Sequence, residues 1–468
     1  MRKHTILQRT LPPQGGGTET VMATLYCGAA ERRVTPALGL NIPQCMTFNP
    51  ATGVKDELFT HALALECDGR AVILISIDTS GLGTAFTRRV REALKREIGI
   101  PPCCVMVSAI HLHTAGPQLM EVFWGQKEDK AVTEDFLRET VAAAVEAYRR
   151  RVPVRMQYVE GREDRFSFCR NYRMKDGSIL MNPGRRRAHE IVEPVAEIDY
   201  TLSAVRFLDG SGRTVAEIVN YACHPDTVGG HEYCADYPGV LRRVLKEQYG
   251  EHTVLFLNGC SGNVNHVDAK RYADPDFRYP KDHYQVMGEA LARDVIALYG
   301  AGTCESADVS VACEWRRFRA PRRQPTEERI AWAKTVLADE SESKVTRRLA
   351  QELLCLARRP KRYALVEMQV LRVGELFVVG FPGEPFADMG LRLREKVAPR
   401  TLILSELANN ELGYFATEPA YSGEVYEAVL PSAIFAPDVL DRMVDTAAEM
   451  VEKATPKNGS PASDGTET

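Results

Sequence analysis

The chain has 468 residues, of which 44% are hydrophobic, and its 63 acidic and 59 basic residues give a formal charge of −4. This length and composition allow one large buried core or two ordinary ones. The charge balance creates no overall positive field, so we predict that nucleic acid is not a partner. The longest apolar runs, such as residues 71–77, have the length of strands, which predicts no integral membrane association.

The two ends of the chain have compositions that disfavour order. Residues 1–25 contain three consecutive glycines and two prolines, without the apolar run of a secretory signal, and residues 454–468 are mostly small and polar. We therefore expect a flexible leader (1–25), one folded domain (26–453) and a disordered tail (454–468) in a cytoplasmic protein. The twelve cysteines contain no CxxC pair, and we expect them to be reduced.

Short β-branched runs alternate with amphipathic segments of helical length. This alternation predicts an α/β fold, with a mixed β-sheet flanked by helices in one large domain. The expected strands are 71–77, 104–110, 204–207, 254–257, 376–381 and 401–404. The expected helices include 134–150, 239–248 and 437–453.

Residues 326–359 form a charged insert with helical periodicity, flanked by arginine-rich segments at 315–323 and 358–362. We interpret the insert as a solvated helical hairpin. The alternative, a nucleic-acid-binding arm, is disfavoured because there are few aromatic side chains on which bases could stack.

The stretch VMVSAIHLHTAGP, residues 105–117, begins as a predicted strand. Side chains alternate between the two faces of a strand, so His111 and His113 would share one face and lie together at its carboxyl end. Ligands bind at this end of the strands in α/β sheets. A single buried histidine is usually a core residue, but two at this spacing favour a metal site or an acid–base site.

A second cluster, NYACHPDTVGGHEYCADYPG, spans residues 220–239. Pro225 favours an extended conformation for His224, which places this imidazole at the junction of a strand and a loop. Asp236 has two interpretations that the sequence does not separate. It is either an acceptor that orients a metal ligand or the N-cap of a helix that begins near Pro238.

A third segment, ELFVVGFPGEPFADMG, places Glu384 after a buried strand and a Pro-Gly turn, at the start of a helix. The helix dipole alone would stabilise a carboxylate there. As a ligand, Glu384 would complete a His-His-Glu set like those of several zinc peptidases. The segment LFLNGCSGNVNH, residues 255–266, lacks the spacing of a nucleophile elbow. We interpret it as a pocket wall in which Asn263 and Asn265 offer hydrogen bonds.

Taken in order, these segments resemble the neutral/alkaline non-lysosomal ceramidase family from about Cys27 to Pro431. The motifs that carry the resemblance are HLHTAGP, NYACHPDTV, CADYPG, LNGCSGNVNH, FPGEPF and LGYFATEPAYSGEVYEA. The resemblance implies one zinc ion per chain at the carboxyl ends of strands, held by His111, His224, Glu384 and Tyr414. It also implies that three residues face the substrate, namely His113, Arg170 (with Arg173 as a second candidate) and Tyr426.

The resemblance implies a hydrolase that cleaves an amide (N-acyl) bond of a small acylated substrate with zinc-activated water. The family's GDVSPN segment reads GNVNHV here, so its serine position is Asn265. This departure predicts a substrate other than long-chain ceramide. Two alternatives keep the same ligands: an esterase or lactonase acting on a small acylated metabolite, and a non-catalytic descendant that only binds one. No pattern in the sequence sets the oligomeric state.

Overall fold

The computed structural model describes residues 23–42, 49–120, 122–123, 126–127, 129–358, 361–423 and 425–456. The predicted flexible leader and disordered tail therefore lie almost entirely outside the described residues.

The larger of the two main sheets is mixed and has nine strands in the described part of the chain. Its order is β16-β14-β13-β8-β1-β3-β4-β5, and β18 also pairs with β8. The strands are β1 (Tyr26–Arg33), β3 (Phe59–Cys67), β4 (Arg70–Ile77), β5 (Val105–Ala109), β8 (Val152–Arg162), β13 (Thr201–Asp209), β14 (Thr214–Tyr221), β16 (Thr253–Asn258) and β18 (Cys304–Glu305). The β4–β5 and β14–β16 pairs are parallel and the others are antiparallel.

A second sheet has the order β19-β20-β21-β23. Its strands are β19 (Val311–Pro321), β20 (Tyr363–Val373), β21 (Leu376–Gly380) and β23 (Thr401–Ser405). The arginine-rich flank at 315–323, for which a nucleic-acid arm was the alternative, therefore lies mainly in β19, at one edge of this sheet.

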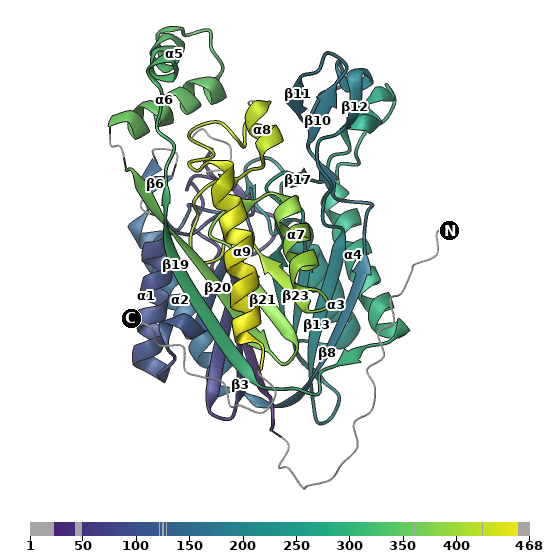
Figure 1. The fold of residues 1–468 in the computed structure, drawn as a ribbon. Helices are drawn as coiled ribbons and strands as arrows, with labels where there is room; N and C mark the ends of the chain where they lie inside the picture. The colour runs from purple at the N-terminus through teal and green to yellow at the C-terminus, as the bar shows by residue number, and fades with distance from the viewer. Residues whose placement is uncertain are drawn as a thin grey trace.

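The two sheets face each other, and helices cover their outer faces in a four-layer arrangement (Figure 1). Strand β4 is buried on both faces, because Ile73 and Ile75 pack toward the helices while Leu74 joins Leu371 and Val378 of the second sheet in the central core. The larger sheet is covered by α1 (Thr84–Ile98), α2 (Lys130–Arg149), α3 (Asp236–Tyr249) and α4 (His283–Ala301), and the second sheet by α7 (Ala387–Val397) and α9 (Pro437–Ala454). The predicted α/β fold with a mixed sheet flanked by helices is confirmed.

The insert forms two helices, α5 (Glu327–Ala338) and α6 (Lys344–Arg358), at the top of the view in Figure 1. They pack against each other through Ala333, Val336, Ala350 and Leu353. Within the described residues, none of the helices combines the length and the apolar character needed to cross a membrane.

Short elements complete the described structure and carry several residues of the site. They are β2 (Gly53–Val54), β6 (Val122–Phe123), β7 (Gln126–Lys127), β9 (Phe168–Cys169), β10 (Asn171–Met174), β11 (Ile179–Met181), β12 (Ile191–Pro194), β15 (Glu232–Tyr233), β17 (Val264–Asn265), β22 (Glu384–Pro385), β24 (Tyr414–Phe415), α8 (Glu418–Ser422) and the 3-10 helices η2 (Pro102–Cys104), η3 (Ala188–Glu190) and η4 (Ala269–Ala273).

Candidate metal centre

Three of the predicted metal ligands follow the carboxyl ends of strands and converge on one point. His111 follows β5, His224 follows β14, and Glu384 follows β21. The Oε2 atom of Glu384 lies 3.2 Å from Nε2 of His111 and 3.2 Å from Nε2 of His224. All three side chains are buried. Residues from both sheets are thus brought into direct contact.

The backbone determines which nitrogen of each imidazole faces Glu384. Nδ1 of His111 lies 2.8 Å from the carbonyl oxygen of Ser80, and Nδ1 of His224 lies 3.0 Å from that of Ser261. A carbonyl oxygen only accepts hydrogen bonds, so each Nδ1 donates and each Nε2 is left facing the carboxylate. Metal-bound histidines are usually held in the same way.

These atoms fit a metal ion. Nε2 of His224 and Oε2 of Glu384 are buried, and neither has a hydrogen-bond partner among the described residues, although they lie 3.2 Å apart. Two neutral imidazole nitrogens and a carboxylate oxygen at this spacing repel one another unless a proton or a metal ion lies between them. A tetrahedral zinc site with bonds of about 2.0 Å separates its ligand atoms by about 3.3 Å, close to the observed spacing.

The electrostatics of the site also favour positive charge beside Glu384. Burial opposes the charged forms, yet Glu384 raises the pKa of His111 to about 10. In return, His111 and His224 hold the pKa of the buried Glu384 carboxyl well below its usual range. The pocket therefore stabilises a carboxylate together with a cation.

A short parallel strand pair brings Tyr414 beside Glu384. Strand β22 pairs with β24, and residues 384 and 414 are directly opposite each other in this register. The buried Tyr414 hydroxyl accepts a hydrogen bond of 3.3 Å from Nη2 of Arg170. The strand pairing therefore makes the phenol oxygen of Tyr414 a candidate for the fourth ligand.

The backbone conformation at His111 differs from the extended strand that the sequence predicts. Strand β5 ends at Ala109, and His111 has a φ of 70°, in the left-handed region that costs a non-glycine residue about 1–2 kcal/mol. The rings of His111 and His113 are nevertheless neighbours, with centroids 5.1 Å apart. The two rings lie together after the strand, as predicted, but a left-handed bend and not strand alternation brings them together.

His113 lies beside the two converging histidines and lines the cavity described below. Its ring centroid is 5.7 Å from that of His224, and its Nε2 is buried without a partner among the described residues. Burial lowers the pKa of His113 to about 3, so the ring is neutral at pH 7. Ring nitrogens of all three histidines lie within 4.8 Å of one another, so the geometry accommodates His113 as a proton acceptor or as a ligand.

Arg170, and not Arg173, reaches this site. Arg170 is buried, donates from Nη2 to the Gly262 carbonyl oxygen at 2.7 Å, and donates from Nε to Glu427 at 2.7 Å. Arg173 lies on β10 with an exposed side chain, 3.5 Å from Glu193. Glu427, which neutralises Arg170, was not assigned a role from the sequence, because nothing in its spacing indicates which cation it will meet.

Replacing Glu427 with glutamine is expected to lower the free energy of unfolding by about 3 kcal/mol, because the Arg170 guanidinium would stay buried without a carboxylate partner. Denaturant unfolding measures this change. Glu418→Gln, at an exposed position on α8, is the matched control and should change stability by less than about 0.5 kcal/mol. Equal stability of the two variants would show that the buried ion pair does not stabilise the fold.

The site opens into a cavity of about 1040 Å³. Its wall includes His111, His113, Arg170, Glu384, Tyr414 and Tyr426. The two tyrosine rings meet edge to face, with centroids 5.8 Å apart. Charged side chains from α1, β19, α6 and nearby loops also line the cavity, namely Arg88, Arg91, Glu92, Arg317, Arg322, Glu352 and Lys361.

Two further acidic residues line the cavity without having been assigned a role from the sequence. Asp226 accepts a hydrogen bond of 3.0 Å from His266, which holds the pKa of its carboxyl below the usual range although burial opposes this. Glu411 accepts from the Gly413 amide at 2.8 Å, and burial together with Glu384 raises the pKa of Glu411 to about 8. Both are in loops, where spacing carries no signal of which way a carboxylate faces.

The three residues predicted for the substrate pocket do not line this cavity. Oδ1 of Asn263 accepts from the Ala387 amide at 2.8 Å, at the start of α7. Asn265 donates to Asn182 at 3.1 Å and affects the cavity only through that side chain. The hydrogen bonds of Asn263 and Asn265 thus go to polar groups of neighbouring segments, and Nδ2 of Asn263 is buried without a partner among the described residues.

Asp236 matches neither of its two interpretations directly. Its carboxylate accepts from the backbone amides of Thr227 at 3.0 Å and Val228 at 3.1 Å, so it holds the loop that follows His224. It also accepts from the Tyr237 amide at 2.6 Å in the first turn of α3, although the N-cap position itself is Ala235. Asp236 therefore positions His224 through the loop and not through the imidazole.

The glycine-rich segment 255–266 packs against the candidate ligands His224 and Glu384. A Cβ at Gly262 would lie 2.5 Å from the Glu384 carbonyl oxygen, so only glycine allows this close approach. The Gly262 amide donates to the Pro385 carbonyl oxygen at 2.9 Å, and Ser261 accepts from His224. The segment therefore fixes the positions of two candidate ligands.

Comparison with known proteins identifies structures with a similar fold. No family model matches the chain. A neutral ceramidase of Mycobacterium tuberculosis (strain ATCC 25618 / H37Rv) is 33% identical over 96 residues, which span 19% of this chain and only 14% of that protein. The solved structure of neutral ceramidase from Pseudomonas aeruginosa is 16% identical with a TM-score of 0.69, covering 94% of this chain and 76% of that one. A structure of ceramidase complexed with C2 is 15% identical with a TM-score of 0.68, covering 94% and 77%. The chain therefore has the fold of the neutral ceramidases, which confirms the resemblance predicted from its motifs.

Proposed function

We propose that this chain is a zinc-dependent hydrolase that cleaves the amide bond of an N-acyl compound. The observation that carries the proposal is the convergence of Nε2 of His111, Nε2 of His224 and Oε2 of Glu384 at a buried point beside a large cavity. The shared fold with proteins named ceramidases supports amide hydrolysis as the reaction class.

One zinc ion would be held by His111, His224, Glu384 and Tyr414. Zinc bound by such ligands lowers the pKa of a coordinated water to about 7 and polarises a carbonyl group, so the reaction requires no nucleophile from the protein. The backbone carbonyls of Ser80 and Ser261 orient the two imidazoles in advance of binding.

Three residues of the chain would act on the substrate. His113, in the cavity wall beside His111 and His224, accepts the proton that the attacking water loses and delivers it to the leaving amine. Tyr426 donates its hydroxyl hydrogen to the carbonyl oxygen as negative charge develops there. Arg170 adds positive charge at the same place and holds the Tyr414 hydroxyl.

We propose further that the substrate is a short or polar acyl compound and not long-chain ceramide. Apolar lining residues such as Trp315 and Leu356 are interrupted by Arg322, Glu352 and Glu411. A long alkyl chain laid against these groups would remove water from them without replacing its hydrogen bonds, which costs several kcal/mol per charged group. A polar substrate avoids this cost.

A side-by-side assay of the zinc-loaded enzyme tests the proposal, with fluorescent long-chain ceramide in detergent against N-acetyl and short N-acyl amines. We expect kcat/KM on the best short substrate to exceed that on ceramide by about two orders of magnitude or more. A higher value on ceramide would contradict the substrate assignment. Cleavage of chromogenic esters but of no amide would contradict the reaction class, and zinc-stripped enzyme is the control for background hydrolysis.

A further inference from the structure

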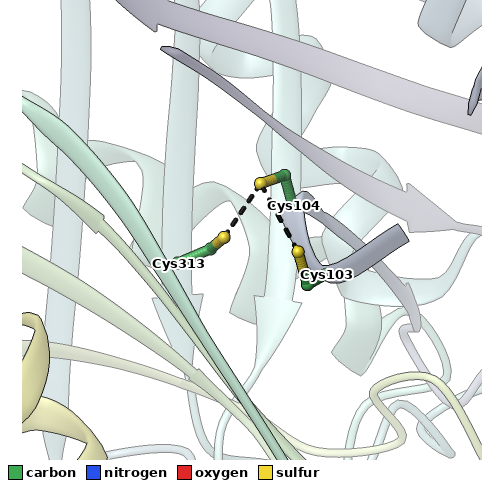
Figure 2. A group of neighbouring side chains, drawn as sticks. All are labelled: Cys103, Cys104 and Cys313. Atoms are coloured by element: carbon green, nitrogen blue, oxygen red, sulfur yellow. Dashed lines mark hydrogen bonds between the residues drawn. The ribbon is translucent and has the colours of Figure 1, made fainter. Parts of the chain in front are cut away.

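Three cysteines lie together outside the candidate metal centre (Figure 2). Cys103 and Cys104 belong to η2, immediately before β5, and Cys313 belongs to β19 of the second sheet. The Sγ atom of Cys104 lies 2.8 Å from that of Cys313 and 3.9 Å from that of Cys103. Two segments 209 residues apart in the sequence therefore place their thiols in contact.

The distance between the Sγ atoms of Cys104 and Cys313 distinguishes between a metal site and a disulfide. Heavy atoms that are not bonded normally approach to about 3.5 Å, so these sulphurs are in unusually close contact. Two thiolates on one tetrahedral zinc ion, with Zn–S bonds of about 2.3 Å, are about 3.8 Å apart. A disulfide requires about 2.05 Å. The observed 2.8 Å is too short for two ligands of one metal ion. The two sulphurs need to move only a little closer to form a disulfide.

We propose that Cys104 and Cys313 form a reversible disulfide that ties η2 to β19. The oxidant is a small peroxide such as hydrogen peroxide, which can enter this half-buried site. One thiol attacks a peroxide oxygen, the O–O bond breaks, and a sulfenic acid and water form. The second thiol attacks the sulfenic sulphur, the S–S bond forms, and the S–O bond breaks with release of a second water. The two thiols together lose two electrons, and one peroxide gains them and is reduced to two waters.

The surroundings of the cluster favour this chemistry. Hydrogen bonds within the cluster lower the pKa of Cys103 and raise the pKa of Cys104 and Cys313, so Cys103 is the thiol that most readily loses its proton. A thiolate adjacent to a disulfide promotes exchange, which makes the bond reducible by an external dithiol. The inference rests on the thiol geometry and does not depend on the proposed hydrolase function.

The crosslink would act on the wall of the cavity. Pro102, which precedes the cysteine pair, and Trp315, two residues after Cys313, both line the cavity. Arg91 and Arg317 lie over the Trp315 ring, with guanidinium carbons 5.1 and 3.9 Å from its centroid. Joining η2 to β19, which otherwise is paired only with β20 among the described strands, therefore adds a covalent link within the wall, and oxidation becomes a means of setting the shape of the cavity.

Disulfide mapping by mass spectrometry tests the inference on the full chain, after treatment with dithiothreitol or with hydrogen peroxide and alkylation of the remaining thiols. We expect a peptide crosslinked through Cys313 only in the oxidised sample. A crosslink between segments so far apart in the sequence should also raise the melting temperature by about 2–5 °C. Both effects should persist in Cys103→Ser, disappear in Cys104→Ser and Cys313→Ser, and be unchanged in Cys355→Ser, an exposed control.

Two results would overturn the inference. One is an oxidised protein in which Cys313 remains free or is linked to Cys103. The other is stoichiometric binding of Cd²⁺ by the reduced three-cysteine cluster, detected by thiolate-to-metal absorption in a His224→Ala background that removes the candidate metal centre. Loss of that absorption in Cys313→Ser would assign the cluster to a metal site instead.

Discussion

Replacing His224 with alanine is expected to remove the bound zinc and to abolish hydrolysis. The side chain is fully buried, its Nδ1 is oriented by the Ser261 carbonyl, and its Nε2 faces Glu384 at 3.2 Å. A structural or catalytic zinc site has few protein ligands, so the loss of one collapses metal affinity. Elemental analysis of the purified variant measures metal content, and we expect about one zinc per chain in the wild type and almost none in His224→Ala.

The control for this experiment is His231→Ala, in the exposed loop that follows His224, which should keep both metal and activity. His111→Ala should reproduce the loss, because its Nε2 is equally close to Glu384. Circular dichroism separates loss of metal from loss of fold. Full zinc occupancy in a folded His224→Ala or His111→Ala protein would remove that residue from the set of ligands.

Replacing His113 with alanine should keep the zinc and lower turnover by roughly 10²- to 10⁴-fold, the range expected for a residue that transfers a proton. The ring lines the cavity beside both candidate ligands, and its neutral form presents an unsatisfied nitrogen. Steady-state kinetics together with metal analysis on the same preparation measures the two effects separately.

The matched control is His189→Ala, because this histidine is exposed on the surface and should be replaceable without effect on kcat. Loss of zinc in His113→Ala would show that all three histidines are ligands and that the proton is transferred by another group. Unchanged turnover with full zinc would exclude His113 from the reaction.

Local patterns in the sequence determined many elements of this fold. The β-branched run 71–77 corresponds to β4, and the amphipathic segment 437–453 corresponds to α9, because periodicity records which faces of an element are buried. The positions of His224 and Glu384 after strands were also evident from their motifs. These features depend on a few neighbouring residues, and so they can be predicted without knowledge of the rest of the chain.

What only the tertiary structure decided is how distant segments meet. Glu427 opposite Arg170, Asn265 turned toward Asn182, and the left-handed conformation of His111 each depend on packing between elements far apart in the chain. The same is true of the contact between Cys104 and Cys313, which exists because one sheet lies against the other. The physical reason is that the sequence around a polar or reactive side chain does not indicate which distant residue it will contact. Burial and close packing select that partner when the two sheets and their loops are assembled.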